Sequence, residues 1–134
     1  MKSKLPVEEF TTPNPVTVPG DLSIDEARLL MREYDIRHLP VLREDIVVGI
    51  VSDRDLRVAQ GLGSEHKLQI RVADIMASDP VSVNASTPLD EVAFEMSARK
   101  IGSVLVNKDS GDFLGIFTVT DALDALIEIV RTGR

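Results

Sequence analysis

The chain has no cysteine and no tryptophan, and its 134 residues include only four phenylalanines and one tyrosine. Without cysteine it can form neither disulfides nor thiolates, so nothing in the sequence requires an oxidising compartment. Five aromatic rings are too few for a base-stacking platform of the kind that binds single-stranded nucleic acid. The sequence therefore indicates neither a disulfide scaffold nor a nucleic-acid binder.

Long hydrophobic runs and an excess of basic residues are also missing. No run approaches the roughly 18 apolar residues of a membrane-spanning helix, and the opening MKSKLPVEEF lacks the apolar stretch of a signal peptide. The formal net charge is −7, which repels nucleic-acid backbones. Apolar residues make up 43% of the chain, a globular balance. We therefore expect a cytoplasmic globular protein that binds neither membranes nor nucleic acid.

The chain contains an internal repeat. Shifted by 65 positions, NPVTV (Asn14–Val18) falls on DPVSV (Asp79–Val83), and IDEARLLM (Ile24–Met31) falls on LDEVAFEM (Leu89–Met96). After Val41 the offset becomes 66, and GIVSDRD then aligns with GIFTVTD. We predict repeat 1 over residues 6–60, a connector over 61–70 and repeat 2 over 71–131.

Each repeat has the pattern of a β-α-β-β-α unit. VTV and VSV predict short strands, and capping boxes at Ser23/Glu26 and Thr87/Asp90 predict helix starts, with Pro88 in the first helical position. Two short apolar runs then predict a strand pair covered on both faces, and a helix closes each copy, over 53–60 and 120–131. About 55 residues make only a marginal core. The fold class expected is α/β (α+β), with two repeats packed sheet-to-sheet about a pseudo-twofold axis.

A hydroxyl and an aspartate recur at the start of each closing helix. Ser52-x-x-Asp55 and Thr118-x-x-Asp121 have the spacing of a capping box, in which the two side chains satisfy free amides of the first turn. The same helix start is also a natural anion site, where a hydroxyl donates to a phosphate and a carboxylate accepts from a ribose. The spacing alone leaves both interpretations open.

The doubled unit, the RHLPV segment (Arg37–Val41) and the Gly-x-x-[Ser/Thr]-x-x-Asp endings resemble a tandem CBS (cystathionine-beta-synthase) domain pair. Such a pair is also called a Bateman module, and the stand-alone prokaryotic type fits best. The resemblance implies a regulatory module that binds an adenosyl ligand in clefts between its repeats: AMP, ADP or ATP, with S-adenosylmethionine or NAD as alternatives. No cofactor is required. It also implies a homodimer, and an effector protein that the sequence does not identify.

The resemblance assigns ribose contacts to the aspartates and phosphate contacts to the hydroxyl residues and to the residues before LPV. The ligand of Asp121 and Thr118 would then meet Arg37 and His38, which can donate to a phosphate. The ligand of Asp55 and Ser52 would meet only the uncharged pair Gly102 and Ser103. We therefore expect the better phosphate site at Asp121. The predicted ligand-binding residues are Thr118, Asp121, Arg37, His38, Ser52 and Asp55.

Other interpretations remain beside the sensor. No nucleophile–base motif or acid cluster indicates catalysis, so we expect no catalytic residues and no enzyme. His38 can equally be a hydrogen-bonded structural residue, and with His66 as the second histidine and no cysteine we expect no metal site. The main alternative function is a structural dimerisation module whose clefts bind nothing. Leu123, Leu126 and Ile127 would suit a dimer interface or an internal core.

Overall fold

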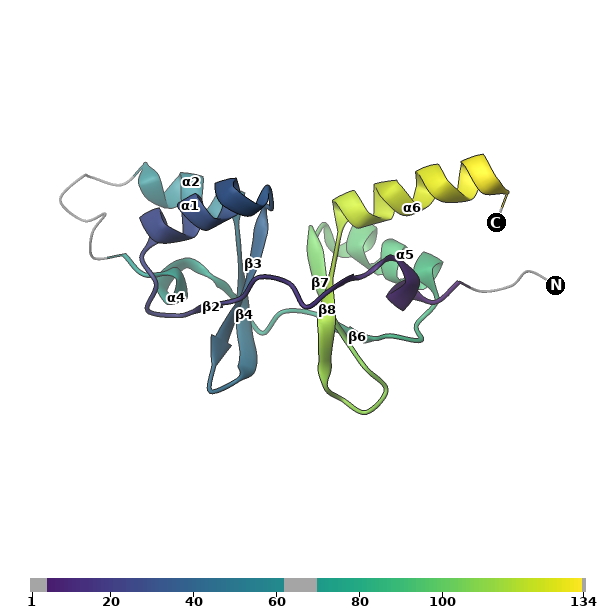
Figure 1. Cartoon of the computed structure of the whole chain (residues 1–134), viewed down its shortest axis with the longest axis horizontal. Helices are drawn as coiled ribbons and strands as arrows, with labels where there is room; N and C mark the ends of the chain where they lie inside the picture. Colours follow the sequence, from purple (N-terminus) through teal and green to yellow (C-terminus); the bar gives the residue numbers. More distant parts are fainter. Residues whose placement is uncertain (1–4, 62–69, 134) are drawn as a thin grey trace. The chain divides into compact units, whose positions relative to one another are not determined.

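The computed structural model describes residues 5–61 and 70–133, which form two compact units (Figure 1). Unit 2 is made of Val16–Pro80, and unit 1 combines Met1–Pro15 with Val81–Arg134. Most of the predicted connector, residues 62–69 with His66, lies outside the described residues. Each unit is a mixed α/β structure around one sheet, so the predicted fold class is confirmed.

Unit 2 contains one complete β-α-β-β-α run and a trailing segment. Its sheet has the order β2-β3-β4-β5, with β2 parallel to β3 and the other pairs antiparallel. Glu44 and Asp45 join β3 to β4 and both have positive φ, as a tight two-residue hairpin turn requires. The elements are β2 (Val18–Pro19), α1 (Ile24–Tyr34), β3 (His38–Arg43), β4 (Ile46–Ser52), α2 (Asp53–Gln60), α4 (Val72–Ile75) and β5 (Ala77–Ser78).

Unit 1 repeats this arrangement. Its sheet has the order β1-β8-β7-β6, with β6 parallel to β7 and the other pairs antiparallel. The elements are the 3-10 helix η1 (Val7–Phe10), β1 (Thr12–Pro13), β6 (Ser82–Asn84), α5 (Leu89–Arg99), β7 (Ser103–Asn107), β8 (Phe113–Thr118) and α6 (Val119–Thr132). The predicted element order of both repeats is therefore confirmed.

The compact units differ from the sequence repeats at their leading segments. The residues that open repeat 1, including η1 and β1, belong to unit 1, and those that open repeat 2, including α4 and β5, belong to unit 2. Val7, for example, is fully buried in the unit 1 core with Val92 and Phe117. Each unit is thus completed by a segment that sequence alignment assigns to the other repeat.

Each core lies between one face of the sheet and two helices. In unit 2 it contains Ile24 and Met31 of α1, Leu56 of α2 and Leu39 of β3. Because strand side chains alternate between faces, Pro40 and Ile50 project from the opposite face, and both are buried as well. Two-sided burial agrees with the continuous apolar runs of these strands.

Gly49 and Gly115 occupy equivalent places in the two sheets, where an edge strand lies close to the backbone. A Cβ on Gly115 would collide with the carbonyl oxygen of Thr12 in β1, and one on Gly49 would collide with the Met76 sulfur. In the register Gly115 faces Pro13, and Gly49 faces Ser78. The repeated glycine is therefore explained by close strand packing.

The side-chain cap predicted for the first helix of each repeat is present in repeat 1 and absent in repeat 2. Ser23 accepts the backbone N–H of Glu26 at 3.1 Å, so the predicted cap is confirmed, and the Glu26 carboxylate accepts from the Ser23 hydroxyl, at 2.9 Å, where the predicted box had it accept from the Ser23 amide. The corresponding prediction at Thr87 was wrong, since α5 begins after Pro88 without a side-chain cap. The Leu89 amide instead donates to the backbone carbonyl of Leu5 at 2.7 Å, so the leading segment of the chain takes the place of a capping side chain.

Within residues 5–61 and 70–133, no helix has the length and apolar composition needed to cross a membrane. No group of three or more potential metal-ligating side chains comes together within the same ranges.

Candidate functional site

The hydroxyl–aspartate pair of unit 2 lies where β4 ends and α2 begins. The Asp55 amide donates to Ser52 Oγ at 3.1 Å, and the Ser52 amide donates to Asp55 Oδ2 at 2.9 Å. These two bonds form a complete capping box, so the local interpretation of the motif is confirmed here. Both residues are half-buried.

The pair of unit 1 has the same geometry with two additional hydrogen bonds. The Asp121 amide donates to Thr118 Oγ1 at 3.2 Å, and the Thr118 amide donates to Asp121 Oδ2 at 2.9 Å. The Thr118 hydroxyl also donates to Oδ2, at 3.1 Å, while the hydroxyl of Thr12 donates to Oδ1, at 3.3 Å. Both carboxylate oxygens of Asp121 therefore accept hydrogen bonds within the unit.

Thr12 is a neighbour of Asp121 that the sequence analysis did not identify. It reaches Asp121 because β1 pairs with β8, which places Thr12 opposite Ile116. At the repeat offset of 65, the residue that corresponds to Thr12 is Ala77, which has no hydroxyl. Comparing the two leading segments position by position would have identified this difference.

Arg37 and His38 lie beside the pair of unit 2. His38 is opposite Ser52 in the β3–β4 register, and the Asp53 amide donates to the Arg37 carbonyl at 2.8 Å. The Arg37 side chain is 75% exposed and forms a long ion pair with Asp53, at 3.7 Å. Asp53 is closer to Arg57, at 3.3 Å. Because the Arg37 side chain is so exposed, most of its guanidinium remains open to solvent.

The equivalent place in unit 1 carries no charge. Ser103 is opposite Thr118 in the β7–β8 register, and the Val119 amide donates to the Gly102 carbonyl at 3.1 Å. The structure thus brings together four of the predicted residues in unit 2 and the other two in unit 1. The assignment of Arg37 and His38 to the ligand of Asp121 stays a prediction, because it joins residues of different units.

The family model of the CBS domain matches residues 7–61 and 72–128, so the chain belongs to the CBS domain family. An inosine-5'-monophosphate dehydrogenase of Korarchaeum cryptofilum is 37% identical over 114 residues, which are 85% of this chain and 23% of that protein. The chain thus spans about a quarter of that relative's length.

Solved structures of similar proteins cover almost the whole chain. A crystal structure of CBSX2 in complex with AMP has a TM-score of 0.77 and 30% identity, and covers 92% of this chain and 97% of its own. The CBS domain pair of protein MJ0100, in complex with 5'-methylthioadenosine and S-adenosyl-L-methionine, has a TM-score of 0.80 and 28% identity; the coverage is 94% and 98%. Both structures are CBS proteins crystallised with adenosyl compounds.

Proposed function

We propose that this protein is a regulatory module, without catalytic activity, that senses an adenine nucleotide or another adenosyl compound. The observation that carries the proposal is the hydroxyl–aspartate pair at the start of α2 and of α6, in a chain whose structural relatives hold such ligands. A helix start offers backbone N–H groups and a positive dipole end to a phosphate. A half-buried carboxylate beside it can accept hydrogen bonds from ribose hydroxyls.

The proposed contacts follow the family resemblance. Asp121 would accept from the ribose and Thr118 would lie near the phosphates, while Arg37 and His38 would donate to the phosphate oxygens. The exposure of the Arg37 guanidinium and its long ion pair with Asp53 support its availability for an anion. Ser52 and Asp55 would form a second, weaker site, because Gly102 and Ser103 supply no cation. AMP, ADP and ATP are the first candidates, followed by S-adenosylmethionine and NAD.

We also propose that the module acts as a homodimer that transmits ligand binding to an effector protein. Leu123, Leu126 and Ile127 of α6 are 54%, 57% and 47% exposed, so they do not form an internal core. Burying these side chains against a second copy would remove a row of apolar surface from water. A ligand that favours one packing of the dimer would then change the surface that the effector contacts.

The alternative is a dimerisation module that binds no ligand. The complete capping boxes favour it, because helix stability alone explains why each aspartate and hydroxyl is present. Under this alternative the α6 surface has the same role, and no nucleotide changes the stability of the fold.

A melting screen with AMP, ADP, ATP, S-adenosylmethionine and NAD separates the two functions. A ligand present at 100 times its Kd stabilises the folded state by about 2.7 kcal/mol, which raises the Tm of a domain of this size by roughly 10 °C. We expect such a shift with at least one compound, and calorimetry should show that Asp121→Ala abolishes tight binding. The dimerisation module predicts no shift with any of the five. An unchanged titration of Asp121→Ala would exclude the assigned site.

A further inference from the structure

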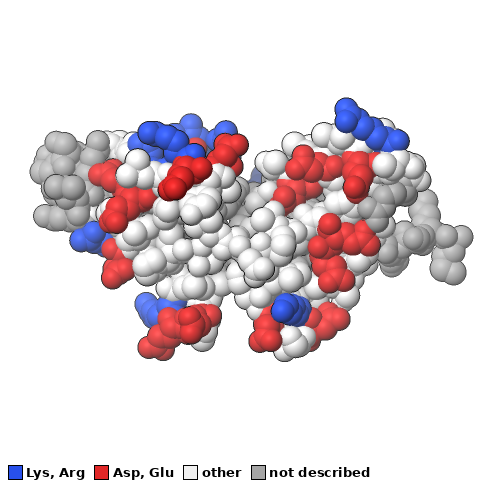
Figure 2. Space-filling view, viewed as in Figure 1, with Lys and Arg blue, Asp and Glu red and all other residues white. Residues whose placement is uncertain are grey.

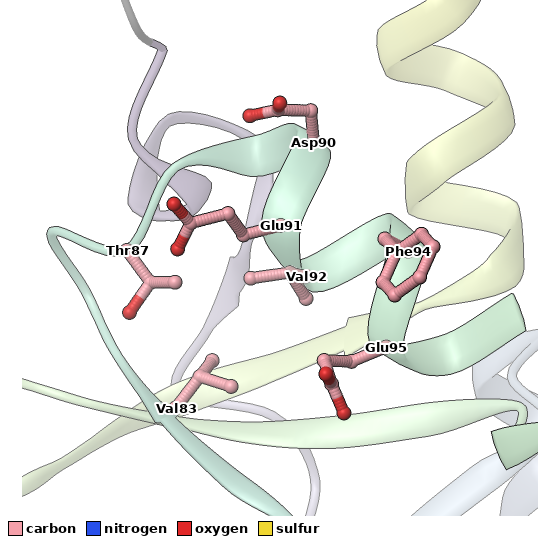
Figure 3. Close-up of a pocket in the computed structure, with 7 residues that line it drawn as sticks. All are labelled: Val83, Thr87, Asp90, Glu91, Val92, Phe94 and Glu95. Carbon is pink, nitrogen blue, oxygen red and sulfur yellow. The ribbon is translucent and has the colours of Figure 1, made fainter. Parts of the chain in front are cut away.

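Unit 1 has a cavity that takes no part in the proposed nucleotide site. Its volume is about 520 Å³, and it lies between the first half of α5 and the segment that leads from β6 into that helix (Figure 3). Figure 3 shows Glu91 and Glu95 extending from the helix on the side where Val83 and Thr87 lie. The lining residues are Val83, Thr87, Asp90, Glu91, Val92, Phe94 and Glu95.

The cavity arises at positions where the two repeats differ. At the offset of 65, Thr87 corresponds to Leu22 and Glu95 to Leu30. In unit 2 both leucines are partly buried and pack against the hydrophobic core. In unit 1 the same positions carry a hydroxyl and a carboxylate, so the flank of α5 is polar where the flank of α1 is covered by leucine. The duplicated fold therefore does not require this cavity.

Carboxylates of α5 lie beside an apolar floor in this cavity. Val83 and the buried Val92 form the floor, and the ring of Phe94 is 69% exposed. Within the described part of the chain Glu95 forms an ion pair with Arg99, at 3.0 Å, whereas Asp90 and Glu91 form none. Glu91 is thus available to a cation on the cavity side of the helix, and the Glu95 carboxylate, in a half-exposed pair with Arg99, can exchange its partner (Figure 3).

We propose that this cavity is the docking site for an arginine-bearing segment of a partner protein. An arginine side chain matches its three chemical features. The aliphatic stem packs on valine, the guanidinium stacks on an aromatic ring, and its planar N–H groups pair with carboxylates. A volume of about 520 Å³ is in the range of ligand-binding clefts. The proposal does not depend on nucleotide binding, because the cavity shares no residue with the hydroxyl–aspartate pairs.

Acidic side chains are spread over the visible surface of both units (Figure 2), so any cation is attracted non-specifically. The test therefore needs a defined probe and a matched charge control. Acetyl-Leu-Arg-Arg-Leu-amide is titrated into ¹⁵N-labelled protein, and the amide shifts are followed by NMR. We expect the largest shifts at Val83, Thr87 and residues 90–95, and weaker binding of the same peptide with citrulline in place of arginine.

Three double variants test the side chains: two change the cavity and one is a charge control. Glu91→Gln with Glu95→Gln should weaken binding of the arginine peptide about tenfold, the effect of losing two partly exposed charge pairs. Asp25→Asn with Glu33→Gln removes the same charge from exposed positions of α1 and should leave the affinity unchanged. Thr87→Leu with Glu95→Leu, which introduces the residues found at these positions in repeat 1, should also weaken binding while the Tm is maintained.

Three results would overturn the proposal. The first is amide shifts that are distributed evenly over the acidic surface. The second is a loss of peptide affinity in the α1 control equal to that in the Glu91/Glu95 variant. The third is a change of oligomeric state in Phe94→Ala without loss of peptide affinity. The last result would assign the cavity to a second copy of the chain. Nucleotide titrations of the Glu91/Glu95 variant should match those of the native protein, so failure of this proposal and failure of the nucleotide site give different results.

Discussion

Replacing Asp121 by asparagine separates the two roles of its side chain, the helix cap and the proposed ribose contact. In the structure Oδ2 accepts the Thr118 amide at 2.9 Å, and Oδ1 accepts the Thr12 hydroxyl at 3.3 Å. Asparagine keeps one carbonyl oxygen, which can take the place of Oδ2 in the capping box. Its NH₂ group replaces Oδ1 and cannot accept a hydrogen bond from a ribose hydroxyl.

The expected magnitudes follow from these contacts. Asp121→Asn loses the interaction of the charge with the α6 dipole, about 0.5 kcal/mol, while its NH₂ group can donate to the Thr12 hydroxyl, which donates to Oδ1 in the native protein. Asp121→Ala loses every bond that the carboxylate accepts and should lower the free energy of unfolding by about 1–2 kcal/mol. For ligand binding both variants lose a hydrogen bond to a charged acceptor, about 1.5–3 kcal/mol, or roughly 10- to 100-fold in Kd.

The effects on stability and on ligand affinity are measured on the same samples. Urea denaturation gives the first, and calorimetry with the nucleotide that raises the Tm gives the second. We expect Asp121→Asn to be nearly as stable as the native protein and to bind as poorly as Asp121→Ala. Asp55→Asn is the matched control, because it changes the equivalent cap in α2 and should reduce binding less. If Asp121→Asn binds with native affinity, the carboxylate serves only the helix and the ribose assignment is wrong.

Three further predictions concern the fold and the dimer. Gly115→Ala should lower the free energy of unfolding, measured in urea, by about 2 kcal/mol or more, because the new Cβ collides with the backbone of Thr12. Gly61→Ala is the control, since its Cβ would come no closer than 3.2 Å to its nearest neighbour. An equal loss of stability in the two variants would contradict this prediction. Phe117→Ala, in the fully buried unit 1 core, should cost about 3–5 kcal/mol, and a loss below 1 kcal/mol would refute tight packing there. Leu126→Glu should make the protein a monomer in sedimentation experiments, and the fold of that monomer should keep its Tm because the side chain is exposed. A stable dimer of this variant would exclude the α6 surface as the interface.

The element order could be predicted because the repeat presents each pattern twice. Alternating helical and strand periods, the proline before each first strand and the two hydroxyl–aspartate pairs are all local signals. The closing helix of repeat 1 was expected over 53–60 and is α2, Asp53–Gln60. That of repeat 2 was expected over 120–131, and α6 extends one residue further at each end, Val119–Thr132.

Contacts between distant segments could not be predicted in the same way. The Thr87 cap had the right local residues, but the backbone of Leu5 already satisfies the Leu89 amide. The bond between Thr12 and Asp121 joins residues 109 positions apart and depends on the pairing of β1 with β8. No spacing rule within a repeat contains this information, because the partner strand comes from the leading segment of the other repeat.

These leading segments also make the hydrogen-bonding surroundings of the two aspartates, Asp55 and Asp121, different. The capping boxes of α2 and α6 have nearly the same geometry, with the aspartate bond to the cap amide at 2.9 Å in both. Gly49 and Gly115 each admit an edge strand close to the helix start, but the strand beside Gly115 carries Thr12 and the strand beside Gly49 carries Ala77. The Thr12 hydroxyl holds Oδ1 of Asp121 in place, and Ala77 has no group that could do the same for Asp55. Divergence in an edge strand can therefore change how a carboxylate is oriented while the helix cap beside it stays the same.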